Sequence, residues 1–275
     1  MSYVDLLKEK TDLFGSLISL GMDPVLEKIP LEGTVEEKIS NFYVAMLDAC
    51  VSEDVMPSTV KPNIAYFEQY GFEGLKALKS ILEHCSVLKV PVVLDVKRGD
   101  IGRTSAAYAR ACFDFWKVDA VTLSPYMGKD VIDPFIRKDK GIYALCKTSN
   151  ASASIMQDVD VGGKKFYEHV ATQIVDWNVG AVVGATFPDE LKSLSSFFGK
   201  CGKEIPLLIP GIGAQGGDLQ LTLRALQESG SDIRIHRINS SSGINYAYLK
   251  AKSDDFAGSA VKELKRLNDV CKGFL

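Results

Sequence analysis

Short apolar runs ending in polar or glycine-containing residues recur along the whole chain. Eight runs have the length of β-strands and are rich in Val, Ile, Leu and Ala, which is typical of strands buried on both faces. They lie at residues 17–22, 59–60, 90–96, 120–124, 141–146, 180–184, 206–209 and 233–238. Because strands buried on both faces belong to sheets covered by helices, the pattern favours a parallel sheet.

Segments with apolar residues three or four positions apart lie between these runs and predict amphipathic helices. We expect helices at the amino terminus and near residues 35–50, 75–82, 106–113, 166–177, 189–198, 219–227 and 256–271, with a polar loop over 151–164. Strand runs that are each followed by a helical segment predict an α/β fold, the (β/α)8 TIM barrel. No linker or shift in composition divides the chain, so residues 1–275 are expected to form a single domain.

Composition and charge narrow the class of protein. The net charge is −3, which gives no electrostatic case for nucleic acid or an anionic membrane as a partner. No apolar run approaches the roughly 20 residues needed to span a bilayer, and the amino terminus lacks a signal-peptide core, so we expect a cytoplasmic protein. The six cysteines and three histidines are scattered without metal-ligand spacing, so we expect buried, reduced cysteines and no metal site.

Charges gather where the third apolar run ends. Side chains alternate along a strand, so Asp95 and Lys97 are expected to point to the same side. Gly99 then breaks the strand, which leaves Asp100 in a turn, free to point elsewhere, while Thr104 or Ser105 can cap the next helix. An ordinary structural ion pair is the alternative. Perturbed charges cluster at functional sites, so the pattern favours a catalytic cluster.

Other notable polar residues also follow strand runs. They are Asp23, Lys61, Ser149 and Gln215. In a TIM barrel the active site forms at the carboxyl ends of the strands, so these side chains are expected to meet the charge cluster at one site.

The segment 211–216 reads Gly-Ile-Gly-Ala-Gln-Gly and matches the pattern G-x-G-x-x-G between a strand and a helix. A dinucleotide-binding fold is one interpretation, with Asp232 near the position of a ribose-binding acid. A second is a phosphate site of the kind that barrels build after strands seven and eight, completed by the serine-rich turn 240–243. A plain tight turn is the third.

Several motifs together resemble the orotidine 5′-monophosphate decarboxylase family, specifically its longer bacterial and archaeal-type subgroup. They are Val60-Lys61-Pro62-Asn63, Leu94-Asp95-Val96-Lys97-Arg98-Gly99-Asp100-Ile101-Gly102-Arg103-Thr104, Lys147-Thr148-Ser149-Asn150, Pro210-Gly211-Ile212-Gly213-Ala214-Gln215-Gly216-Gly217 and Asn239-Ser240-Ser241. The resemblance implies decarboxylation of orotidine 5′-monophosphate to uridine 5′-monophosphate in de novo pyrimidine biosynthesis, with neither a metal nor an organic cofactor.

The resemblance also assigns roles to residues. Lys61, Asp95, Lys97 and Asp100 would form a network of alternating charge, with Lys97 as the proton donor to C6 of the pyrimidine. Asp100, Ile101 and Thr104 would reach into the neighbouring subunit's site, which makes the enzyme a homodimer with shared active sites. Asp23 and Lys61 would hold ribose hydroxyls, Ser149 would bind the pyrimidine edge, and Gln215 with backbone groups of the seventh and eighth loops would bind the phosphate. The residues assigned to substrate binding also include Asn150, Pro210, Gly213, Gly216, Ser241 and Ser242.

One position departs from the family. Its members usually have Arg after the paired serines of the eighth strand as a phosphate ligand, and this chain has Ser242. Arg237 lies five residues earlier, and whether it substitutes is open. Two other readings also stay open: a metal-dependent aldolase of the same superfamily, similar to hexulose-phosphate synthase, and a non-catalytic nucleotide-binding barrel.

Overall fold

Eight parallel β-strands form one sheet that closes on itself. The computed structural model describes residues 1–212 and 216–275. Around the sheet the strands follow the order β2-β1-β10-β9-β8-β5-β4-β3. They are β1 (Ile18–Met22), β2 (Thr59–Pro62), β3 (Val93–Arg98), β4 (Ala120–Leu123), β5 (Gly141–Lys147), β8 (Gly180–Val183), β9 (Leu207–Ile209) and β10 (Arg237–Ser240). Parallel bridges between the two edge strands, at Val60–Val92 and Asn63–Asp95, nearly complete the barrel. The predicted (β/α)8 architecture is confirmed.

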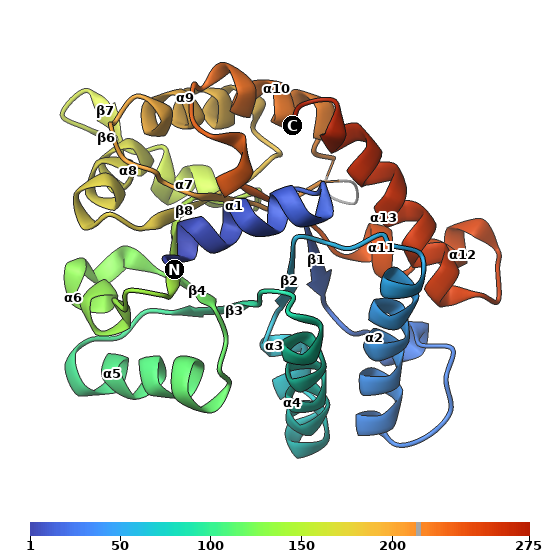
Figure 1. The fold of residues 1–275 in the computed structure, drawn as a ribbon. Coiled ribbons are helices and arrows are strands. Elements are labelled where there is room, and N and C mark those ends of the chain that lie inside the picture. Colours follow the sequence, from blue (N-terminus) through green and yellow to red (C-terminus); the bar gives the residue numbers. More distant parts are fainter. Residues whose placement is uncertain (213–215) are drawn as a thin grey trace.

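Long helices surround the strands, and α1 lies across them (Figure 1). The helices are α1 (Tyr3–Phe14), α2 (Val35–Ser52), α3 (Ala65–Glu68), α4 (Gly71–Leu88), α5 (Gly102–Arg110), α6 (Lys129–Ile132), α7 (Ala153–Gln157), α8 (Phe166–Trp177), α9 (Pro188–Gly199), α10 (Leu219–Glu228), α11 (Ser242–Asn245), α12 (Ala247–Ala251) and α13 (Phe256–Lys272). Local sequence sets where they begin. The Thr34 hydroxyl accepts the Glu37 N–H and the Glu37 carboxylate reaches back to Thr34, which starts α2 with a capping box.

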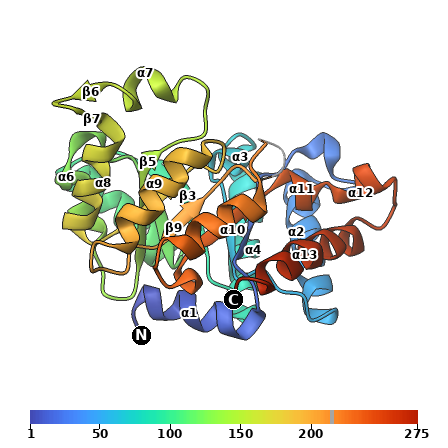
Figure 2. The same ribbon diagram turned by 90° about the horizontal axis from the view of Figure 1, so that it is seen from above.

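Helix α1 closes the amino-terminal end of the barrel. Its Tyr3 and Leu7 belong to a small apolar cluster with buried residues of β3, β4, β5, β8 and β9. The hydroxyls of Tyr3 and Tyr143 lie 3.2 Å apart inside that cluster. Figure 2 shows α1 at one end of the molecule, with α7 and the β6–β7 hairpin (Asp160–Val161 and Lys164–Lys165) at the opposite end. The strand carboxyl ends therefore open on the side away from α1.

The structure differs from the predicted elements in several places, including the eighth strand and the expected polar loop. The eighth strand begins at Arg237 and not at residue 233, because Asp232 accepts the Arg234 N–H and caps a 3₁₀ turn over Ile233–Ile235. The expected polar loop over 151–164 contains α7 and most of the β6–β7 hairpin. Its turn uses Gly162 and Gly163 at positive φ, which glycine adopts without steric cost.

The cysteines behave as core residues, as predicted. All but Cys201 are buried. Burial raises the pKa of the Cys50 and Cys85 thiols to about 12, so both are held as neutral thiols at pH 7.

Within the described ranges, no helix combines the length and the apolar composition that crossing a bilayer requires.

Candidate active site

A cavity of about 710 Å³ lies at the carboxyl ends of the strands. It receives side chains from the segments that follow most of the barrel strands, as the barrel prediction required. Of the predicted site residues, it is lined by Asp23, Lys61, Asp95, Lys97, Ser149, Asn150, Pro210, Ser241 and Ser242. The structure thus brings together residues that are up to 219 positions apart in the chain.

Asp95 is held between two lysines in this cavity. The Lys61 ammonium lies 3.1 Å from Asp95 Oδ2, and the Lys97 ammonium lies 2.6 Å from Asp95 Oδ1. Lys61 and Asp95 are buried, whereas the Lys97 side chain is half-exposed. The alternating order Lys61–Asp95–Lys97 leaves one net positive charge, and Lys97 is the member that reaches open space.

The electrostatics keep the inner pair ionised. Burial alone would raise the pKa of the Asp95 carboxyl, but the Lys61 and Lys97 ammonium groups hold it well below its ordinary value. Burial alone would lower the pKa of Lys61, and the charges of Asp95 and Asp23 outweigh that effect and raise it. Asp95 is therefore a fixed negative charge across the physiological range, which anchors both ammonium groups.

An irregular backbone in β3, and not the alternation of side chains along a regular strand, brings Lys97 to Asp95. The pairing of β3 with β4 shifts register between Leu94 and Arg98, and Lys97 has φ 42°. A non-glycine residue in this left-handed region costs of the order of 1–3 kcal/mol and marks functional sites when the surroundings hold it there. The prediction that Asp95 and Lys97 lie together is right, but its reason, simple alternation, is wrong.

Thr122, which no motif in the sequence identified, holds this irregular backbone in place. Its hydroxyl donates to Asp95 Oδ1 at 2.7 Å and accepts the Lys97 backbone N–H at 3.0 Å. The side chain also lines the cavity. A polar residue inside the otherwise apolar run at 120–124 was the available indication.

Asp100, Ile101 and Thr104 lie outside the cavity of their own chain. The Asp100 carboxylate accepts the Ile101 backbone N–H at 2.8 Å, and Ile101 is 48% exposed. The predicted helix cap at Thr104 or Ser105 is wrong. Helix α5 begins at Gly102 with no side-chain cap, because the chain turns at that glycine with φ 55°.

The ends of β1 and β10 approach closely on the cavity wall. A Cβ at Gly21 would lie 1.9 Å from the Ser241 hydroxyl oxygen, so only glycine fits there. Asn239 donates to that hydroxyl at 3.1 Å. Asp23 Oδ1 is buried and has no hydrogen-bond partner among the described residues, which leaves it available to a ligand hydroxyl.

The segment after β5 forms another wall of the cavity, and hydrogen bonds hold its backbone in place. Gln157 accepts the Thr148 N–H at 2.9 Å and donates to the Thr148 hydroxyl at 2.7 Å. That hydroxyl donates in turn to Asn150 Oδ1 at 2.6 Å. Below them the buried Lys147 ammonium pairs with Asp158 at 2.6 Å. These contacts fix the backbone that carries Ser149 and Asn150.

The glycine-rich turn follows β9 in a closed barrel, which rejects the dinucleotide-binding interpretation. Asp232 pairs with Arg234 and forms no part of the cavity lining. Gly213 and Gln215 lie outside the described residues. Gly216 is exposed with φ 85° and does not line the cavity, whereas Gly211 does.

Arg237 does not substitute for the missing arginine. Its guanidinium is fully buried and donates to the Leu7 carbonyl at 2.6 Å and to the Thr11 hydroxyl at 3.1 Å. Both partners belong to α1, at the opposite end of the barrel from the cavity. Arg237 is a structural residue that fastens α1 to β10.

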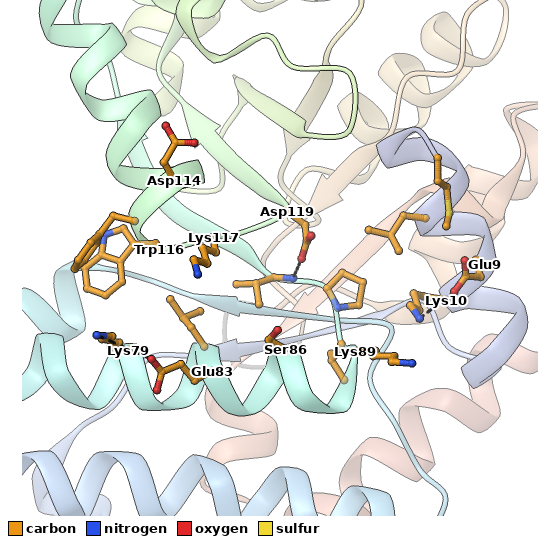
Figure 3. A pocket seen from close by; sticks show the side chains of 17 residues that line it. Glu9, Lys10, Lys79, Glu83, Ser86, Lys89, Asp114, Trp116, Lys117 and Asp119 are labelled. Atoms are coloured by element: carbon orange, nitrogen blue, oxygen red, sulfur yellow. Dashed lines mark hydrogen bonds and ion pairs between the residues drawn. The ribbon is translucent and has the colours of Figure 1, made fainter.

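A second cavity of about 750 Å³ lies at the amino-terminal end, between α1, α4 and the segment before β4 (Figure 3). None of the predicted site residues lines it. The Asp119 carboxylate there accepts the Val92 N–H at 2.9 Å, so it completes the backbone pairing of β3. No three His, Cys, Asp or Glu side chains are grouped as a metal site would require, over residues 1–212 and 216–275.

A barrel with a Lys–Asp–Lys array at the carboxyl ends of its strands is the architecture of a TIM-barrel enzyme. Residues 46–240 match the model of the orotidine 5′-phosphate decarboxylase / HUMPS family, and the chain belongs to that family. An orotidine 5′-phosphate decarboxylase from Azoarcus sp. is 40% identical over 284 residues, covering 100% of both chains, and one from Dechloromonas aromatica is 41% identical over 271 residues, covering 94% of both. The solved OMP decarboxylase of Leishmania donovani is 33% identical with a TM-score of 0.78, covering 98% of this chain and 99% of that one.

Proposed function

We propose that this chain is a decarboxylase that converts orotidine 5′-monophosphate to uridine 5′-monophosphate in pyrimidine biosynthesis, a carbon–carbon lyase reaction carried out by side chains alone. Two relatives that match 94–100% of its length carry the name of this activity. The observation that carries the proposal is the array in which Asp95 holds the Lys61 and Lys97 ammonium groups at 3.1 and 2.6 Å.

The chemistry that this substrate needs matches the array. The bond between C6 and the carboxylate breaks, CO₂ leaves, and the electron pair stays on C6, where no cofactor ring delocalises it. An ammonium fixed beside C6 stabilises that charge and then transfers its proton to C6. At an effective dielectric constant near 20, two unit charges about 4 Å apart interact by about 4 kcal/mol, or roughly three decades of rate. Lys97 is the half-exposed ammonium and is assigned this role.

The rest of the cavity suits a nucleotide. Its volume of about 710 Å³ lies within the range of small-molecule sites. Asp23 and Lys61 are assigned to ribose hydroxyls, because Asp23 Oδ1 is a buried acceptor with no partner among the described residues. Ser149 and Asn150 are assigned to the pyrimidine edge and the serines of the eighth loop to the phosphate. The contacts of Gly213, Gln215 and Gly216 stay predictions.

A homodimer with shared active sites is part of the proposal. Asp100, Ile101 and Thr104 are absent from the lining of their own cavity, as residues that act in a partner's site would be. Ile101 is exposed, as are Tyr126 and Met127 after the neighbouring strand β4. Exposed apolar side chains on adjacent loops favour an interface. A cytoplasmic location and the action of residues 1–275 as one domain also stay predictions.

Loss of orotidine 5′-monophosphate absorbance on mixing with purified protein, with uridine 5′-monophosphate as the product, tests the proposal. The family model also covers HUMPS enzymes. A metal-dependent aldolase would lose its activity in a chelator, whereas the decarboxylase proposed here is expected to keep its rate. A non-catalytic barrel would bind the nucleotide without turnover.

A further inference from the structure

The phosphate end of the cavity lacks the arginine that the family resemblance led us to expect. Ser242 occupies that position, and Arg237 is fastened to α1 at the other end of the barrel. Among the described residues, three cations line the cavity: Lys28, Lys61 and Lys97. Two of them are paired with Asp95. Lys28 is the remaining positive charge.

Lys28 lies directly against the loop that carries Ser242. It ends a 3₁₀ turn, Leu26–Lys28, after β1, and its ammonium lies 5.1 Å from the centre of the Tyr246 ring. Tyr246 follows α11, which begins at Ser242. The lysine is exposed and has no ion-pair partner in the part of the chain that the structure describes. Its charge is therefore available to an incoming anion.

Hydrogen bonds of two tyrosine hydroxyls connect the loop after β1 to the segment after β10. Tyr246 accepts the Val25 N–H at 2.8 Å and donates to the Asp23 carbonyl at 3.1 Å. Tyr248 donates to the carbonyl of Lys28 itself. The backbone of Lys28 is thus positioned by the loop that presents Ser241 and Ser242, while its long side chain stays adjustable. The ring of Tyr246 limits where the ammonium can lie, which lowers the entropy cost of placing it.

We propose that Lys28 is the cationic contact for the substrate phosphate, in the role that arginine at position 242 would otherwise fill. This inference rests on the proposed function. A lysine binds phosphate as a point charge with three donors, without the bidentate geometry of a guanidinium. The hydroxyls of Ser241 and Ser242, on the same cavity wall, supply neutral contacts beside it. The positive charge thus comes from the loop after β1 instead of the loop after β10.

Comparison of ligands with and without a phosphate tests the assignment. Wild-type turnover of orotidine 5′-monophosphate is measured first, so that failure of the proposed function is seen separately. Calorimetry then gives Kd for uridine 5′-monophosphate and for uridine with wild type, Lys28→Gln, Lys28→Arg and Lys250→Gln. Lys250→Gln is the matched control, because this exposed lysine of α12 has the same charge but does not line the cavity.

Lys28→Gln is expected to raise the Kd of the nucleotide about tenfold or more, which corresponds to about 1.4 kcal/mol, and to leave that of uridine within about twofold. Lys28→Arg and Lys250→Gln are expected to bind like wild type. Adding Ser242→Arg to Lys28→Gln is expected to recover most of the lost affinity, while Ser242→Arg alone gains little. Equal losses for both ligands would assign Lys28 to packing against Tyr246 and overturn the proposal. An unchanged nucleotide Kd in Lys28→Gln would overturn it too.

Discussion

The Thr122 hydroxyl joins two members of the charge array, since it donates to Asp95 Oδ1 at 2.7 Å and accepts the Lys97 backbone N–H at 3.0 Å. The first bond holds one carboxylate oxygen in line with the Lys97 ammonium. The second holds the backbone of Lys97 at φ 42°, where a non-glycine residue is strained. The direction in which Lys97 enters the cavity thus depends on a residue of the next strand.

Thr122→Val removes both bonds and nearly keeps the shape of the side chain. A hydrogen bond to a charged group is worth about 1.5–3 kcal/mol, so we expect kcat to fall roughly 10- to 100-fold while KM changes by less than about threefold. Steady-state kinetics measure this split. Thr122→Ser keeps the hydroxyl and should retain most of the activity. A rise in KM alone would show that Thr122 contacts substrate and does not position Lys97.

Shared active sites predict complementation between two inactive variants. Lys97→Ala and Asp100→Ala each remove one side of the proposed shared site. A mixed dimer contains one site that lacks both groups and one that lacks neither, so mixing is expected to restore partial activity. Activity is measured after subunit exchange has been verified with a label. If exchange is complete and no activity returns, Asp100 acts within its own chain or not at all.

Arg237 is expected to affect stability and not substrate binding. Arg237→Met removes the hydrogen bonds that the buried guanidinium donates to the Leu7 and His236 carbonyls and to the Thr11 hydroxyl. A hydrogen bond from a charged group contributes about 1.5–3 kcal/mol, so the free energy of unfolding should fall by about that amount, as denaturant titration can measure. KM for orotidine 5′-monophosphate should stay within about twofold. Arg224→Met, on the exposed face of α10, is the control and should change neither quantity. If Arg237→Met instead raised KM and left the unfolding free energy unchanged, Arg237 would be a phosphate ligand and not a structural residue.

The buried His236 ring is expected to make the protein less stable in mild acid. The Leu207 N–H donates to its Nδ1 at 3.1 Å, so the neutral ring carries its proton on Nε2 and donates to the Ser231 hydroxyl at 2.8 Å. Burial, and then the adjacent charge of Arg237, lower the pKa of this ring from 6.5 to about 3. The folded state therefore takes up this proton at a lower pH than the unfolded state does. Its stabilising contribution is complete above about pH 6.5 and is lost as the pH falls toward 3, by about 1.4 kcal/mol per pH unit.

Denaturant titrations of wild type and His236→Gln between pH 7.5 and pH 4.5 measure this effect. The difference in unfolding free energy between the two proteins should shrink with each step below about pH 6.5. A difference that stays constant with pH would mean that the ring has the same pKa in the folded and unfolded states, contrary to its lowered pKa in the folded protein.

The barrel could be predicted from the sequence because its strands are buried on both faces and so read as separate apolar runs. The position of the site followed from topology, since Asp23, Lys61 and Ser149 each come after such a run. The eighth strand was predicted to start too early because Ile233 and Ile235 look like strand residues. Their apolar side chains belong to a 3₁₀ turn that packs at the end of the barrel. Apolar character alone does not separate these two cases.

Other features required three-dimensional information. The bend at Lys97 and its bond to Thr122 depend on the register between β3 and β4, which no periodicity specifies. Whether Arg237 faced the cavity or the opposite end depended on where β10 begins. Lys28 became a candidate only when the fold placed the first loop against the eighth, 214 positions away at Ser242.

Lys97 is proposed as the acid that completes decarboxylation, and turnover by Lys97→Ala is the measurement that decides this role. Absorbance of orotidine 5′-monophosphate is followed with wild type and variant, and calorimetry with uridine 5′-monophosphate verifies that the variant still binds. Turnover is expected to be abolished while nucleotide binding stays detectable, because a positioned acid alone is worth about 10²–10⁴ in rate. A variant that binds nucleotide and keeps more than about a hundredth of the wild-type kcat would show that Lys97 is not the proton donor.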